Sequence, residues 1–115
     1  MATQLSGSKE ELAFSGDTPA VGTTIFEAVY AANLTAWVII PTGVTACTVK
    51  IRAAFKSTDP TAQNWPVIMT IDHADDAQAA PKELTQFAPG RWKHVVVELS
   101  AYTGGGNDVE VYLMT

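Results

Sequence analysis

The 115-residue chain has 7 basic and 12 acidic residues, a net charge of −5 and a single cysteine. This length suits one domain with its own core, the acidic balance argues against nucleic acid as a partner, and one cysteine excludes an internal disulfide. No run reaches the ~20 apolar residues of a membrane span, and the first 12 residues lack signal-peptide features. We therefore expect a soluble protein made in the cytoplasm, without a membrane partner.

Residues 1–22 are rich in Ser, Gly and Thr. Ser8 followed by Glu11 fits a capping box, which indicates a short helical turn. Leu12 and Phe14 come next and would either begin a strand or dock on another surface. We interpret residues 1–22 as an N-terminal arm or edge segment, ahead of a β-sandwich domain over residues 23–115.

The rest of the chain has the alternation of strands. The clearest pattern runs from Val44 to Lys56, where Cys47, Val49 and Ile51 alternate with polar residues, so Cys47 is expected to be buried. Strands are expected at residues 23–31, 35–40, 44–56, 65–73, 83–87, 91–99 and 108–114. With turn residues between them, they predict an all-β fold, an antiparallel β-sandwich of seven to eight strands, jelly-roll-like or immunoglobulin-like.

The sequence shows no motif of catalysis. It lacks a nucleophile elbow, a phosphate-binding loop and a dinucleotide fingerprint. We therefore predict no catalytic residue, no cofactor and no enzyme activity. The densest polar group is Asp72, His73, Asp75 and Asp76, whose oxygen-rich side chains are of a type that binds metals. Because the loop glycine and closing Glu of an EF-hand are missing, we interpret it as an acidic loop at a strand end, predict no metal ligand, and leave metal binding open.

The three tryptophans are assigned by their neighbours. Trp37 lies in a strand that is apolar on both faces and is expected in the core, whereas Trp92 follows a Pro-Gly turn and suits the core or its rim. Trp65 follows a polar loop and precedes Pro66, which makes it the best candidate for an exposed aromatic, although a ring that caps the core is the more common arrangement. Exposed Trp and Tyr side chains stack on sugars or anchor protein interfaces.

The segment from Leu84 to Leu99, with Gly90-Arg91-Trp92 at its turn, and the strand from Val109 to Leu113 form a recognisable pattern. They resemble the last strands of jelly-roll modules of the galactose-binding and carbohydrate-binding type. The resemblance implies a carbohydrate-binding module, but sugar-binding residues vary among those families and none can be carried over. The exposed aromatics that would stack on sugar in this chain are Trp65, Trp92 and Tyr102.

The Met-Ala-Thr start, the Ala/Thr/Gly-rich composition, the N-terminal arm and the compact β domain together resemble small structural proteins of tailed bacteriophages, of the capsid decoration or cement type. This resemblance implies a virion protein, made in the host cytoplasm, that stabilises a capsid or other viral lattice. Its partner would be a major capsid or other virion protein, with homo-oligomers such as trimers compatible. The contacts expected in the arm are Leu5, Leu12 and Phe14. Carbohydrate binding is the alternative function.

Overall fold

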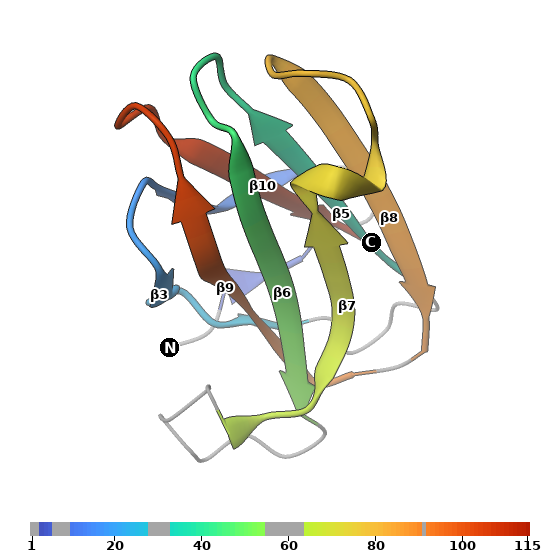
Figure 1. The fold of residues 1–115 in the computed structure, drawn as a ribbon. Coiled ribbons are helices and arrows are strands. Elements are labelled where there is room, and N and C mark those ends of the chain that lie inside the picture. The colour runs from blue at the N-terminus through green and yellow to red at the C-terminus, as the bar shows by residue number, and fades with distance from the viewer. Residues whose placement is uncertain (1–2, 6–9, 28–32, 55–63, 91) are drawn as a thin grey trace.

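The computed structural model describes residues 3–5, 10–27, 33–54, 64–90 and 92–115, which form two β-sheets packed face to face (Figure 1). Sheet A has the spatial order β1 (Thr3–Gln4), β4 (Phe26–Glu27), β9 (His94–Thr103), β6 (Ala46–Ala54) and β7 (Val67–Asp72), and β3 (Ala20–Val21) also pairs with β9. Sheet B has the order β2 (Glu11–Gly16), β10 (Val109–Met114), β5 (Asn33–Ile40) and β8 (Lys82–Pro89).

The predicted all-β fold class is confirmed, with ten strands among the described residues in place of the seven to eight predicted. Within the described part of the chain, every strand pair is antiparallel except β1 with β4. Strands that follow one another in the chain mostly lie in different sheets, and β6 with β7 is a pair that stays within one sheet. The chain therefore crosses repeatedly between the layers, and this crossing closes the core between them.

The core is made by the alternate residues that each strand turns toward the other sheet. In β5 these are Leu34, Ala36, Val38 and Ile40, and in β6 they are Cys47, Val49, Ile51 and Ala53. Cys47 is buried, as its position in the alternation predicted. The central strand β9 differs, because Val95, Val96 and Val97 are all buried. Val96 lies outside the main core and packs with Trp65, Val21 and Ile25 in a second, smaller cluster on the outer side of sheet A.

Several predicted boundaries are corrected. Strand β9 continues to Thr103 through residues predicted as a turn, because its far end pairs with β6 from Ala46 to Thr48. Of the strand predicted at 23–31, only residues 26–27 are strand among those described, and 28–31 lie outside the described residues. The helical turn predicted from Ser8 and Glu11 is not found at Glu11, which begins β2; Ser8 lies outside the described residues.

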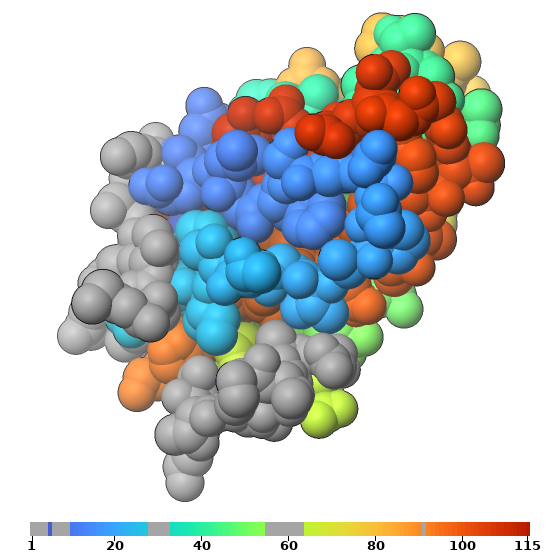
Figure 2. Space-filling model, turned by 90° about the vertical axis from the view of Figure 1, so that its left-hand side faces the viewer, coloured from blue at the N-terminus to red at the C-terminus, as the bar shows by residue number. Residues whose placement is uncertain are grey.

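Residues 11–16, within the segment predicted as an arm or edge segment, form the edge strand of sheet B. They pair with β10, so that Phe14 lies opposite Val111 and Gly16 opposite Val109. Figure 2 shows this part of the chain, in blue, beside the C-terminal residues, in red. A bulge between Val111 and Tyr112 shifts the register. Among the described residues there is no helix long and apolar enough to cross a membrane.

Candidate protein-binding face

Sheet B presents aromatic and aliphatic side chains on the side that faces away from the core. Because Ala36 and Val38 are buried, Trp37 and Ile39 of the same strand point outward. Tyr112 lies opposite Trp37, and Leu12 lies opposite Tyr112, so these three form one row across three strands. The surface is called here the aromatic face, and it consists of Leu12, Trp37, Ile39, Phe87, Tyr112 and Met114.

Three of these side chains are unusually accessible for their type, and the other three are half-buried. Phe87 is 65% exposed, Leu12 49% and Trp37 36%. Within the described chain the remaining large apolar side chain of this kind is Val67, which lies on β7 of the other sheet. Single exposed apolar residues are ordinary, but several gathered on one face mark an interaction surface.

Acidic side chains border the aromatic face. Glu83 and Glu110 lie opposite Ile39 on its two neighbouring strands. A shallow pocket of about 240 Å³ lies on this face and is lined by Glu10, Glu83, Trp37, Ile39 and Tyr112. Lys82 is the one basic residue in the four strands of sheet B, and it is buried. The aromatic face is therefore apolar at its centre and acidic at its border.

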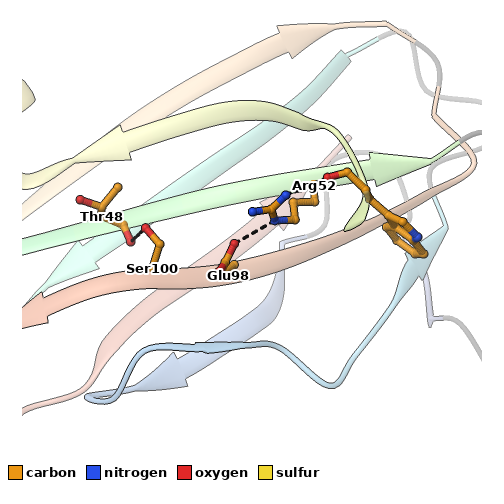
Figure 3. Close-up of polar contacts among 5 residues, drawn as sticks. Thr48, Arg52, Glu98 and Ser100 are labelled. Carbon is orange, nitrogen blue, oxygen red and sulfur yellow. Dashed lines mark hydrogen bonds and ion pairs between the residues drawn. The ribbon is translucent and has the colours of Figure 1, made fainter. Parts of the chain in front are cut away.

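The outer side of sheet A is different in character (Figure 3). Arg52 Nε donates to Glu98 Oε1 at 2.8 Å, and its Nη1 donates to the backbone oxygen of Trp65 at 2.9 Å. Ser100 Oγ donates to the backbone oxygen of Thr48 at 3.2 Å. Arg52, Glu98 and Ser100 are thus engaged with one another and with the backbone, and sheet B, with its exposed apolar side chains, is the better docking surface.

The carboxylates of the acidic loop are used by the loop itself. Asp72 accepts hydrogen bonds from the Ala74 amide and the Thr48 hydroxyl, each at 2.8 Å, while Asp75 accepts from the Asp72 amide at 2.9 Å. These bonds favour the charged form and, chief among them the one from Ala74, hold the pKa of Asp72 below its ordinary value. The described residues contain no group of three or more His, Cys, Asp or Glu able to hold a metal ion.

A lysine ammonium occupies the centre of this loop. Lys82 Nζ donates to the backbone oxygens of His73, Asp76 and Gln78 at 2.6 to 2.7 Å, which uses all three of its N–H groups. The side chain is 9% exposed, so these bonds form away from bulk water. The loop is therefore ordered by a cation that the chain itself supplies.

The three predicted partner contacts do not lie together at the surface. Leu5 is buried in the core, and its amide donates to the backbone oxygen of Glu27 at 2.9 Å. Phe14 is half-buried and packs against the core. Leu12 is exposed on the aromatic face. Of the three, Leu12 is thus the exposed one, because pairing of β2 with β10 places Phe14 opposite the buried Val111, and their contact with a partner stays a prediction.

The predicted sugar-stacking aromatics are not exposed platforms either. Trp65 is only 5% exposed and packs with Val96, which agrees with a ring that caps the core and not with an exposed aromatic. Trp92 is half-buried against the core and lies over Gly90, where a Cβ would come within 2.6 Å of its ring. Tyr102 Oη donates to the backbone oxygen of Asn107 at 2.8 Å and accepts from the Gly106 amide at 3.2 Å.

Trp37 is the aromatic residue whose location was predicted wrongly. It was expected in the core, yet it lies on the outer side of β5 beside Tyr112. The signal was present in the alternation of β5, where Asn33 and Thr35 share the side of Trp37 and mark that side as the outer one.

No protein-family model and no curated protein matches the chain. Among solved structures, it is similar to the SPBc2 prophage-derived protein YomS, with a TM-score of 0.54 over 91% of each chain and 13% sequence identity. At this identity the likeness shows a shared fold. The chain is thus an antiparallel β-sandwich with a structural neighbour encoded by a prophage.

Proposed function

We propose that the protein is a structural component of a phage particle that decorates and stabilises a capsid or other viral lattice by binding a neighbouring protein through the aromatic face. The observation that carries the proposal is the exposure of Leu12, Trp37 and Phe87 on one side of sheet B. The prophage origin of the structural neighbour supports the phage context. The proposal assigns no catalysis and no cofactor, and it places the protein in the virion.

The composition of the aromatic face favours a protein partner. Trp, Tyr, Phe and Met are enriched at the centres of protein interfaces. Leu12 and Met114 add flexible aliphatic area of a kind that packs against other side chains. A repeated lattice would multiply one modest contact into firm attachment through avidity. Trimers fit threefold positions of such a lattice and remain part of the proposal.

The strand order supports placing the sandwich among jelly rolls. Sheet B runs β2-β10-β5-β8, and sheet A contains the run β4-β9-β6-β7. Eight strands in two sheets, linked by repeated crossings, are typical of that architecture, which is common in viral capsid proteins and lectins.

The proposal is tested by sedimentation from the native source during particle assembly. Wild-type chain is compared with Phe87→Ser and with the matched control Val67→Ser, an exposed apolar residue on the other sheet. Wild type and the Val67 variant are expected to sediment with particles at a fixed ratio to a major shell protein, while the Phe87 variant stays near the top of the gradient. Wild-type protein that never enters the particle fractions would refute a virion role.

Carbohydrate binding is the second candidate, at residues other than those first predicted. Trp37 and Tyr112 lie side by side in register on β5 and β10, and Glu83 lines the same pocket as a hydrogen-bond acceptor. Aromatic rings beside acceptors are the usual elements of a sugar site. A broad glycan array with wild type and Trp37→Ala tests this, and binding that the substitution abolishes would favour the second candidate over the first.

A further inference from the structure

The pocket on the aromatic face joins two kinds of group that attract cations. Trp37 and Tyr112 line it, and Glu10 and Glu83 bring carboxylates to the same pocket. Aromatic faces attract cations through their ring electrons, most strongly when the ring is Trp. Carboxylates form short, charge-assisted bonds with N–H donors.

The surroundings strengthen this preference for positive charge. Glu110 lies opposite Ile39 and adds a third carboxylate to the same side of the sheet. Lys82, the one basic residue within the strands of sheet B, points its ammonium to the backbone oxygens of residues 73, 76 and 78. Along the described strands of this sheet no positive side chain is left to neutralise the pocket from within.

We propose that this pocket receives an arginine side chain from the protein that docks on sheet B. The inference rests on the proposed function, because it names the group that the partner inserts. A guanidinium is flat, stacks on aromatic rings and offers a fork of donors to carboxylates. Its plane lies along Trp37 and Tyr112, and its N–H groups point to Glu10 and Glu83. Lysine fits less well because its ammonium is a compact, strongly hydrated charge.

Charge complementarity also selects against the other occupants of this face. A second copy presenting the same face would bring Glu83 and Glu110 against their own counterparts, and like charges in contact oppose association. An anionic glycan meets the same repulsion. A neutral sugar would gain the ring stacking and an acceptor in Glu83, but it has no positive charge for the surplus of carboxylates to attract.

The test is a titration of the full-length ¹⁵N-labelled protein with N-acetyl-arginine methylamide, followed by nuclear magnetic resonance. The matched control probe is the citrulline derivative, which has nearly the same shape and no charge. We expect saturable shifts at the Trp37 indole and at the amides of Ile39 and Glu83, with a dissociation constant on the order of millimolar for one side chain. Citrulline should give no saturable shift.

Variants separate the pocket from the general field of the face. Glu83→Gln should weaken the arginine probe about fivefold, whereas Glu110→Gln, which removes the same charge outside the pocket lining, should change binding by less than about twofold. Trp37→Leu keeps apolar cover and should abolish saturation. The spectra themselves show whether each variant remains folded, and the exposed Glu83 makes the first variant safe for folding.

The proposal is overturned if arginine gives no saturable shift, if citrulline binds equally well, or if maltose saturates the pocket and arginine does not. These outcomes are distinct from failure of the proposed function. Particle association without arginine binding would remove only this inference. Arginine binding by a chain that never sediments with particles would remove the virion role and leave a pocket for a basic protein of another kind.

Discussion

Backbone oxygens gathered in one loop are otherwise satisfied by water or by a metal ion. In this loop the ammonium of Lys82 donates hydrogen bonds to them instead. Its three bonds to backbone oxygens form at a site shielded from solvent. Lys82→Met should leave three acceptors without a donor and lower the free energy of unfolding by about 2–4 kcal/mol. Urea denaturation measures this, with Lys50→Met as the control, for which we expect a change within about 0.5 kcal/mol. Equal losses in the two variants would contradict the role assigned to Lys82.

Asp72 makes stability sensitive to acid. Its hydrogen bonds hold the native pKa below the ordinary 3.8, so the unfolded chain takes up the proton first as the pH falls. The stabilisation is complete above the unfolded pKa and is lost as the pH falls through the native pKa. Asp72→Asn should therefore flatten the fall in the free energy of unfolding between about pH 5 and pH 3. Denaturation curves measured across this pH interval test the prediction. An unchanged slope of the free energy of unfolding against pH would show that other carboxylates cause most of the acid sensitivity.

Cys47 is expected to be chemically silent while the protein is folded. Burial, together with the charge of Asp72, raises the pKa of the Cys47 thiol to about 11, and the side chain is 2% exposed. The thiolate is the reactive form, so a thiol reagent at pH 8 should modify Cys47 only through opening of the sandwich. Labelling rates should rise in step with urea-induced unfolding. Rapid labelling of the native protein would show that β6 opens on its own.

At the scale of the strand, two tryptophans have opposite roles, and that of Trp37 differs from the core position predicted for it. Trp65 seals Val96 against solvent and holds the Arg52 side chain through its backbone oxygen, whereas Trp37 faces outward. Trp65→Ala should lower the free energy of unfolding by about 3–5 kcal/mol, and Trp37→Ala by less than about 1 kcal/mol. Thermal and urea denaturation of the two variants give the comparison. Similar losses would place both rings in the core.

The alternation of residues predicted which strands exist and which side of most strands is buried. It succeeded for β6, where Cys47 and Val49 are in the core, because period-two patterning reflects burial on one side. It failed where a distant segment decides exposure. Val96 is buried because Trp65, 31 residues earlier in the chain, covers it, and a pattern within one strand carries no information about such a cover.

For the same reason, only part of the candidate site could be predicted from the sequence. Leu12 was among the predicted contacts, but its neighbours Tyr112 and Trp37 come from strands about 100 and 25 residues away along the chain. Register between strands is fixed by pairing in the folded sheet. Only strand order brings these three residues into one row, and strand order was left open by the sequence.

For the molecule as a whole, the two outer surfaces differ in how far their charges are paired: Arg52 pairs with Glu98 on sheet A, whereas the described strands of sheet B hold no basic residue besides the buried Lys82. Lys50 and Arg52 lie on the outer side of β6, and Glu83 and Glu110 border the aromatic face on the opposite side. The aromatic face is therefore apolar enough to associate but carries a border that repels its own copy. The acidic border of the aromatic face therefore determines which partner binds, and the apolar centre supplies most of the affinity.

This difference predicts how the isolated protein behaves. Sedimentation velocity at neutral pH and low salt should give the same mass distribution for wild type and Phe87→Ser, because the aromatic face is held apart from its copies by like charge. Any trimer that forms should then use surfaces other than this face, since the substitution leaves it intact. A lower mass for the Phe87 variant would instead show that the aromatic face is a self-association surface. A partner that inserts an arginine would then have to compete with a second copy of the chain for this face.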